Sequence, residues 1–473
     1  MKAKFLFILI FIYTSNVFSQ SASKNLEQQL NSLLANDYFK STQVSVDIFD
    51  LTTNQVVYKK NEKLLLRPAS NMKILTTASA LNFIGTDYKF KTKVWMNGEI
   101  EDSVLLGDIY FQGGCDPDFT YDDLIFLIKE IKTKGIKQIA GNVSLDVSNL
   151  DSLFWGEGWM WDDEPSTDFP YLTSMVIDDN AVSIITKPSG NIGEPAIVQT
   201  LHPSNFDLIN ETETVAEGRS RIKVTRDWMN RSNTIIVSGK INADSKEDTS
   251  SISIFDPKEY FLYLINDIME KEKISVEGDF TITPKPEMAE MIFSFERPFS
   301  DVIVNLNKNS DNLSAEMTLR ALGFLADSLK SSAQKGLKFV DSLISIIGLN
   351  PKEYRLADGS GVSHYNLITT ELVNQILRFF YNEKKDLYPI LYNSFPIGGV
   401  DGTLKYRMRK TEAENNVHAK TGTLSGVSSL SGYLTSRSGH TISFSIFMQN
   451  FVESSSKARE FQDKICNLLI EGI

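Results

Sequence analysis

The chain has few cysteines, few histidines and, beyond residue 20, no long apolar run. Two cysteines in 473 residues, Cys115 and Cys466, exclude a disulfide scaffold, and we expect both to be buried free thiols. The four histidines show no paired spacing and no His-Glu-x-x-His motif, so zinc catalysis is not supported. No apolar stretch after residue 20 approaches the roughly 20 residues that a membrane-spanning helix needs.

Excess positive charge and a serine-hydrolase elbow are also absent. The formal net charge is -12 and the isoelectric point lies near 5.1, which disfavours nucleic acid and anionic membranes as partners. No Gly-x-Ser-x-Gly sequence occurs, which argues against a Ser-His-Asp hydrolase. The sequence implies no metal and no organic cofactor. A chain of 473 residues is longer than a domain with a single hydrophobic core usually is, and it indicates two or three domains.

The amino-terminal segment has the features of a secretory signal peptide. Lysines at positions 2 and 4 precede an apolar run from Phe5 to Tyr13 and a small-residue cleavage site that ends at Ser19. We therefore expect cleavage after Ser19 and export of the chain. An uncleaved anchor is disfavoured because the apolar run is short, and no cysteine follows it that could carry a lipid.

The stretch around which the chain is organised runs from Arg67 to Leu81, where Pro68 leads into an apolar segment with helical spacing. Ser70 and Lys73 lie three residues apart, on one helical face, so a hydroxyl and an amine can meet there. The first turn of the helix offers backbone N–H groups that stabilise negative charge near Ser70. Burial would favour the neutral form of Lys73, as a base requires. Alone this spacing is weak evidence, because other Ser-x-x-Lys pairs occur in the chain.

Two further motifs follow in order, Ser310-Asp311-Asn312 and Lys420-Thr421-Gly422. With Ser70 and Lys73 they resemble the three-motif signature of β-lactamases and penicillin-binding proteins. The set suffices for acyl transfer. Ser70 attacks a carbonyl while Lys73 takes its proton, and the cation of Lys420 disfavours a charged Lys73. Ser310 can relay the proton to the leaving amine, and Asn312 can orient Lys73 and hold the substrate amide.

The long spacing between the first two motifs differs from compact β-lactamases and resembles the low-molecular-mass class C penicillin-binding proteins. Three more segments carry this resemblance: Gly113-x-x-Asp116-Pro117, Asp358-Gly359-Ser360-Gly361 and Gly399-x-Asp401-Gly402-Thr403-Leu404. The family consists of periplasmic D-alanyl-D-alanine carboxypeptidases and endopeptidases. The resemblance therefore implies a periplasmic serine DD-peptidase that acts on peptidoglycan stem peptides, cleaves D-Ala-D-Ala termini and D-Ala-meso-diaminopimelate cross-links, and is acylated by β-lactams.

The resemblance also assigns roles around these motifs. It implies an oxyanion hole from the backbone N–H groups of Ser70 and Thr423, and a carboxylate site from Thr421, Thr423 and Lys420. Gly422 would let the substrate approach the strand. Trp161-Asp162-Asp163 resembles the segment whose acidic residue receives the diaminopimelate amine, which makes Asp163 the candidate, and Leu424 flanks the same pocket.

Some features of these segments stay open. The tryptophans at 155, 159 and 161 form either a small satellite core or the wall of a binding cleft. Cys115 and His364 depart from the family pattern, where a small residue and an arginine are usual. A β-lactamase, or a catalytically silent secreted peptidoglycan-binding protein, is the alternative function, and the oligomeric state is open.

The alternation and helical patterns predict an α+β fold, in which an antiparallel sheet with helices on both sides is interrupted by a large insertion. A hairpin near residues 44–58 and strands at 429–435 and 441–448 should join in one sheet, so the first and last segments belong to one domain. The expected parts are a signal peptide at 1–19, a discontinuous peptidase domain at 20–87 and 296–473, an inserted α+β domain at 88–173 and 252–295, and a nested small β domain at 174–251.

Overall fold

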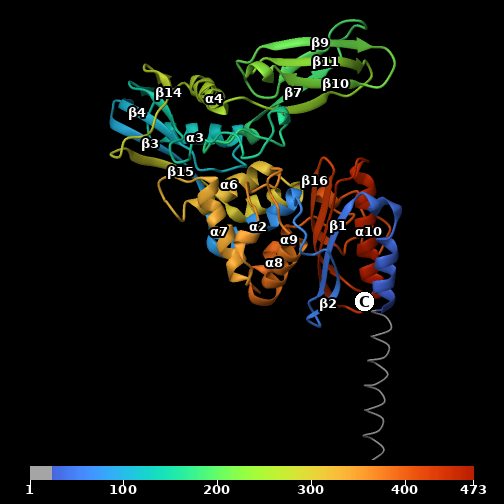
Figure 1. Ribbon diagram of the computed structural model, residues 1–473. Coiled ribbons are helices and arrows are strands. Elements are labelled where there is room, and N and C mark those ends of the chain that lie inside the picture. The colour runs from blue at the N-terminus through green and yellow to red at the C-terminus, as the bar shows by residue number, and fades with distance from the viewer. Residues whose placement is uncertain (1–23) are drawn as a thin grey trace, which may run out of the picture. The chain divides into compact units, whose positions relative to one another are not determined.

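The computed structural model describes residues 24–473, so the predicted signal peptide lies outside the described residues (Figure 1). Contacts divide the chain into two compact units. The first contains the described residues up to Gly85, together with Ile303–Asp311 and Leu337–Ile473, and the second contains Thr86–Val302 and Asn312–Gly336. The first unit is discontinuous, and residues 312–336, which the sequence prediction placed in the peptidase domain, belong to the second unit. The predicted domain bounds, including the nested domain at 174–251, stay predictions.

The first unit is built on a five-stranded antiparallel sheet. Its order is β16-β17-β18-β1-β2, which places strands from the two ends of the chain side by side (Figure 1). The strands are β1 (Gln43–Asp50), β2 (Gln55–Lys60), β16 (His418–Leu424), β17 (Val427–Thr435) and β18 (Thr441–Gln449). This pairing confirms the prediction that the late strands join the amino-terminal hairpin.

Helices cover both faces of this sheet. The helix that includes residues 24–33 and α10 (Ser455–Gly472) supply apolar side chains to a core with β1, β17 and β18. α8 (Thr370–Glu383) contacts β1 and β18 and also packs against α2 (Met72–Phe83). Seven of the eight residues of β1 are buried, as expected for a strand covered on both faces. Other helices with residues in this unit are α5 (Phe299–Val304) and α7 (Ala333–Ile346), which both begin in the second unit, and α9 (Tyr388–Ser394).

The second unit contains a seven-stranded mixed sheet with two helices packed on it. Its strands are β3 (Lys89–Glu101), β4 (Val104–Gln112), β5 (Gln138–Ile139), β6 (Val143–Asp146), β13 (Ser275–Val276), β14 (Phe280–Ile282) and β15 (Glu290–Pro298). α3 (Tyr121–Thr133) and α4 (Pro257–Lys271) bury their apolar faces in the core of this unit. Thr120 caps α3, since its hydroxyl accepts a hydrogen bond from the Asp123 N–H.

Two three-stranded sheets complete the second unit. One has the order β12-β7-β8 and the other the order β10-β11-β9, in which β9 and β11 run parallel. Their strands are β7 (Ala181–Lys187), β8 (Ile197–Thr200), β9 (Leu208–Val215), β10 (Arg221–Arg226), β11 (Ile235–Asn242) and β12 (Asp248–Ser253). Arg226 at the end of β10 is fully buried, and its guanidinium pairs with Glu164 and donates to the Ser253 carbonyl at 2.9 Å.

Both cysteines are buried and form no disulfide within the described residues, as predicted. Burial raises the pKa of the Cys115 thiol to about 12 and also raises the pKa of Cys466, so neither is set up as a nucleophile. Among residues 24–473, no helix combines the length and the apolar character needed to span a bilayer.

Candidate active site

The nucleophile candidate lies on a strained turn at the start of a buried helix. Ser70 belongs to η2 (Ala69–Asn71), which leads directly into α2. Ala69 has φ +47°, in the left-handed region that costs energy for a residue with a Cβ. The Lys73 ammonium nitrogen Nζ lies 3.1 Å from Ser70 Oγ and donates to it, and Lys73 is fully buried. The structure therefore brings the predicted hydroxyl and amine together.

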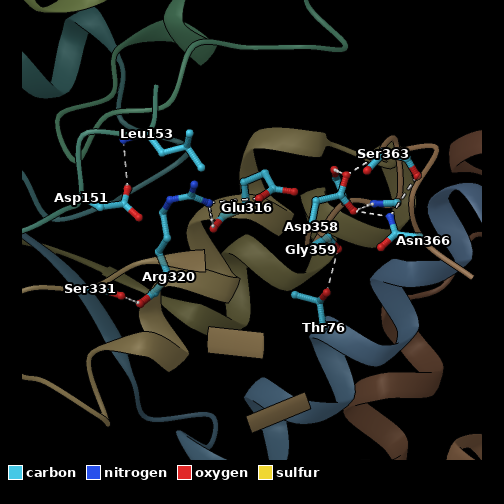
Figure 2. A network of polar contacts seen from close by, with 12 residues as sticks. Thr76, Asp151, Leu153, Glu316, Arg320, Ser331, Asp358, Gly359, Ser363 and Asn366 are labelled. Atoms are coloured by element: carbon cyan, nitrogen blue, oxygen red, sulfur yellow. Dashed lines mark hydrogen bonds and ion pairs between the residues drawn. The ribbon is translucent and has the colours of Figure 1, made fainter. Parts of the chain in front are cut away.

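A glycine-dense loop holds Lys73 from the other side. Lys73 Nζ also donates to the Ser360 carbonyl at 2.8 Å. One residue earlier, the Gly359 carbonyl accepts from Thr76 Oγ1 at 2.7 Å, a contact that Figure 2 shows as a dashed line. Gly361 has φ +88°, and a Cβ there would come within 2.0 Å of the Ala69 carbonyl oxygen. Two consecutive carbonyls of this loop thus position the face of α2 that carries Lys73.

The loop is fixed by one buried carboxylate. Asp358 is 1% exposed, and its Oδ1 accepts from the Gly361 N–H at 2.8 Å and from Asn366 Nδ2 at 2.7 Å. Its Oδ2 accepts from the Ser363 N–H at 2.7 Å, and Figure 2 shows the contacts with Ser363 and Asn366 converging on the carboxylate. Sequence reasoning noticed the glycines here but not this function of Asp358.

Ser310 and Lys420 form the second half of the site. Ser310 follows η6 (Asn305–Asn309) in a left-handed conformation, with φ 63°. Lys420 on β16 is fully buried, and its Nζ donates to Ser310 Oγ at 2.7 Å and to the Thr421 carbonyl at 3.0 Å. Burial and then the charge of Lys73 lower the pKa of Lys420 well below its ordinary value. The two lysines therefore lie close enough for each to oppose protonation of the other.

The segment before Ser310 is anchored within the first unit. Asn307 Nδ2 donates to Ser394 Oγ at 2.9 Å, and the Lys308 ammonium pairs with Asp401 at 2.5 Å. Gly402 has φ +51°, and a Cβ there would come within 2.4 Å of the Lys308 carbonyl oxygen. The glycine-dense loop around Asp401 is thus needed to hold η6, and with it Ser310.

Strand β16 runs directly beside η2. Asn71 Nδ2 donates to the Lys420 carbonyl at 3.0 Å, and Ser429 Oγ donates to the Pro68 carbonyl at 2.6 Å. A Cβ at Gly422 would lie 2.9 Å from the Ser70 nitrogen and 2.2 Å from Ser429 Oγ. From the sequence, Gly422 was predicted to let the substrate approach the strand closely. The structure shows that the close packing of the strand against the turn that carries Ser70 also requires a glycine.

The other predicted residues of this strand are Thr421 and Leu424, which are half-buried, and Thr423, which is exposed. Thr421 Oγ1 is 2.7 Å from Thr403 Oγ1, and Thr423 Oγ1 accepts from the Arg459 guanidinium at 3.1 Å. Leu424 ends β16 and is half-buried. The contact of Arg459 with Thr423 was not predicted, because nothing in the sequence of α10 distinguishes Arg459 from an ordinary surface cation. His418, at the start of β16, stacks on Tyr392 with 4.0 Å between the ring centroids.

Asn312 and Asp163 belong to the second unit. Asn312 begins α6 (Asn312–Gly323) two residues after Ser310, and its Nδ2 donates to the Asp168 carbonyl at 2.6 Å. Asp163 ends η3 (Trp161–Asp163), is half-buried, and accepts from the Met160 N–H at 2.7 Å. The loop that carries Asp163 therefore also binds the Asn312 side chain, through the Asp168 carbonyl. In the first unit, Lys73 contacts Ser70 and Lys420 contacts Ser310.

The three neighbouring tryptophans lie in two different environments. Trp155 and Trp159 pack at 5.3 Å between ring centroids, and Trp155 also contacts Tyr171 at 5.2 Å. Trp161 is 69% exposed and lies 5.4 Å from Trp228. Two of the tryptophans therefore form a satellite core, and the third lies at the surface.

Comparison with known proteins decides the family. The model of the D-Ala-D-Ala carboxypeptidase 3 (S13) family matches residues 26–471. The chain belongs to this family. It is 29% identical over 436 residues to the D-alanyl-D-alanine carboxypeptidase of Actinomadura sp. (strain R39), covering 89% of this chain and 80% of the relative. It is 28% identical over 417 residues to D-alanyl-D-alanine carboxypeptidase DacB of Haemophilus influenzae, covering 86% of each.

A solved structure supports the same assignment. The crystal structure of penicillin binding protein 4 (dacB) from Haemophilus influenzae matches with a TM-score of 0.81 and 25% identity over 93% of this chain and 99% of that one. The predicted resemblance to class C penicillin-binding proteins, the α+β fold and the assignment as a serine D-Ala-D-Ala carboxypeptidase are therefore confirmed. A second structure of the Haemophilus protein is a complex with a β-lactam.

Proposed function

We propose that this D-Ala-D-Ala carboxypeptidase works through an acyl-enzyme on Ser70 and that its substrates are peptidoglycan stem peptides. The observation that carries the proposal is the hydrogen bond of 3.1 Å from the buried Lys73 to Ser70 Oγ, on a turn that the Ser360 loop holds in place. A nucleophile within hydrogen-bond reach of a base, with a third group orienting the base, is the arrangement that activates a serine.

In this mechanism a neutral Lys73 takes the Ser70 proton while Oγ attacks the carbonyl of the penultimate D-Ala. Burial of Lys73, in a site shared with a second buried lysine, Lys420, disfavours its charged form. When the tetrahedral intermediate collapses, the C–N bond breaks, Ser310 donates its proton to the departing amine of D-Ala, and the proton that Lys73 accepted replaces it on Ser310, which leaves Lys73 neutral again. Water then attacks the acyl-enzyme, its proton returns through Lys73, and the shortened stem leaves with a free carboxylate.

The strand beside Ser70 binds the developing charge and the terminal carboxylate in this proposal. The backbone N–H groups of Ser70 and Thr423 form the oxyanion hole, and the missing side chain at Gly422 leaves the Ser70 N–H accessible. Thr421, Thr423 and Lys420 bind the terminal carboxylate of the substrate. The guanidinium of Arg459, bonded to Thr423 Oγ1, adds a positive charge at this end of the strand.

We also propose cleavage of D-Ala-meso-diaminopimelate cross-links. Asp163 receives the free amine of the diaminopimelate side chain, and Leu424 flanks the same pocket. The half-buried position of Asp163 in a turn supports this role, because such a carboxylate is accessible to a cation and is held in one orientation by the Met160 N–H. Asn312 orients Lys73 and binds the substrate amide.

Export to the periplasm and acylation by penicillin complete the proposal. The segment at 1–19 directs export, and the ring carbonyl of a β-lactam reacts with Ser70 as the substrate carbonyl does. A β-lactamase would release the opened antibiotic rapidly, and a silent binding protein would not react with it.

The direct test is release of D-Ala from a stem pentapeptide that ends in D-Ala-D-Ala. Wild-type protein should release stoichiometric D-Ala, and Ser70→Ala and Lys73→Met should each lose at least about a thousandfold in kcat/KM. Ser454→Ala is the matched control, because Ser454 and Lys457 have the same spacing outside the site and this variant should keep its activity. Unchanged turnover by Ser70→Ala would remove Ser70 from the mechanism.

The cross-link activity needs a separate substrate pair. We would compare Asp163→Asn with wild type on a diaminopimelate dimer and on the same dimer with the side-chain amine acetylated. The variant should lose about tenfold on the free amine and little on the acetylated dimer. An equal loss on both dimers would exclude Asp163 as the amine-binding residue.

A further inference from the structure

An aromatic pocket in the second unit has no role in the steps above. Its volume is about 370 Å³, and it is lined by Phe154, Trp155, Trp161, Glu164, Tyr171, Trp228, Met229 and Arg231. Every one of these residues lies in the second unit, and none belongs to the three catalytic motifs.

The pocket exposes large apolar side chains that a folded protein normally covers. Trp161 is 69% exposed, Met229 is 67% exposed and Phe154 is 49% exposed. Trp161 and the half-buried Trp228 lie 5.4 Å apart with their planes inclined by 36°, so they form one continuous aromatic surface. Contiguous exposed apolar surface around a hollow is typical of a binding site.

The floor of this pocket is rigidly built. Glu164 accepts from the Tyr171 hydroxyl at 2.5 Å and pairs with the fully buried Arg226. The Arg226 guanidinium also donates to the carbonyls of Ser232 at 3.2 Å and Ser253 at 2.9 Å. This buried ion pair ties the tryptophan loop to the end of β10, next to η5 (Trp228–Asn230), so the two aromatic walls are pre-organised.

The polar groups define the chemistry of the ligand. The Glu164 carboxylate is neutralised by Arg226, which leaves the exposed Arg231 as the cation of the pocket lining. The Arg231 guanidinium makes no ion pair or hydrogen bond with any residue in the described range 24–473. A fitting ligand therefore has flat apolar faces, polar edges and a carboxylate.

We propose that this pocket binds the amino-sugar strand of peptidoglycan, with a pyranose ring against Trp161 and Trp228. Arg231 binds a carboxylate of the stem peptide or, where no stem is attached, the muramyl carboxylate. The C–H faces of a pyranose match an aromatic surface, and its hydroxyl and acetamido edges stay in water. Trp161 shares the turn η3 with Asp163, the candidate for the stem amine. The pocket would thus bind the glycan to which a stem is attached, and this inference rests on the proposed substrate class.

The first test is binding of a peptide-free N-acetylglucosaminyl-N-acetylmuramic acid disaccharide, followed by tryptophan fluorescence and calorimetry. Trp228→Ala should weaken binding about tenfold through the lost ring contact. Arg231→Met should weaken binding of the muramic disaccharide about fivefold and leave the affinity for chitobiose, which lacks the carboxylate, unchanged. Tyr406→Ala, which removes a 77% exposed ring from the first unit, is the matched control and should bind as wild type does.

The second test is the ratio of D-Ala release from glycan-linked stems to release from the free pentapeptide. Trp228→Ala should lower this ratio about fivefold or more, while Tyr406→Ala should not. Absence of disaccharide binding to folded wild type, or equal binding by all variants, would overturn the amino-sugar site. The binding test does not depend on turnover, so an inactive enzyme that binds the disaccharide would refute the proposed function and keep this inference.

Discussion

Replacement of Asp358 by asparagine should slow acylation of Ser70 by loosening the loop that holds Lys73. The Asp358 carboxylate fixes the loop whose Ser360 carbonyl accepts from Lys73 Nζ at 2.8 Å. An asparagine has the same shape but only one acceptor oxygen. Both carboxylate oxygens accept hydrogen bonds from N–H donors. In either orientation, the asparagine amide therefore places its NH₂ group against at least one of these donors, which loses its acceptor.

The magnitude follows from those bonds. A hydrogen bond to a charged group contributes about 1.5–3 kcal/mol, and a buried N–H left without an acceptor costs about 1–3 kcal/mol. We expect Asp358→Asn to lower the free energy of unfolding by about 2–5 kcal/mol. Displacement of the Ser360 carbonyl also misaligns Lys73, and a misplaced catalytic group costs on the order of tenfold to a hundredfold in rate.

The assay is the second-order rate of penicillin adduct formation, measured by intact mass at a temperature where circular dichroism shows the variant to be folded. Asp116→Asn is the control, since Asp116 is equally buried and is bonded to Arg297 in the second unit. The control should be destabilised to a similar degree and keep its acylation rate. A folded Asp358→Asn protein with the wild-type acylation rate would refute the positioning role, as would an equal loss in the control.

Three further variants test other parts of the site. Burial and the neighbouring Lys73 hold the pKa of Lys420 in the folded protein well below its value in the unfolded chain, which is about 10.4. Between these two pKa values the unfolded state binds more protons than the folded state, so the free energy of unfolding of the wild type should increase as the pH rises toward about 10.4. Lys420→Met should remove this rise in thermal melts at pH 7 and 10 and abolish acylation. Gly422→Ala should clash with the Ser70 turn, lose about 1–3 kcal/mol of stability and acylate at least tenfold more slowly, whereas Gly190→Ala, with open space around it, should be silent in both measurements. Arg459→Met should raise KM about fivefold for peptides with a free terminal carboxylate and leave the matching terminal amides unaffected in steady-state kinetics.

The candidate residues of the three motifs could be picked out from the sequence because each motif carries its own local signal. Ser70 and Lys73 share a helical face by spacing alone, and Lys420 lies in an alternating strand segment. The joining of β1 to β18 also followed, because a hairpin at one end of the chain and two strands at the other leave few other pairings.

Contacts made through the backbone carry no such signal. Lys73 is held by the carbonyl of Ser360, and a carbonyl is present at every residue, so only the glycines of that loop were visible in the sequence. Arg459 resembles any surface cation of an amphipathic helix until α10 is packed beside β16.

The measurement that tests the account most directly is the intact mass of the purified protein after incubation with benzylpenicillin, followed by peptide mapping. We predict one penicilloyl adduct, located on Ser70, that persists for minutes and is absent from Ser70→Ala. An adduct at another residue, or none on folded wild-type protein, would contradict the acyl-enzyme mechanism. Rapid turnover of the antibiotic without accumulation of the adduct would instead favour a β-lactamase.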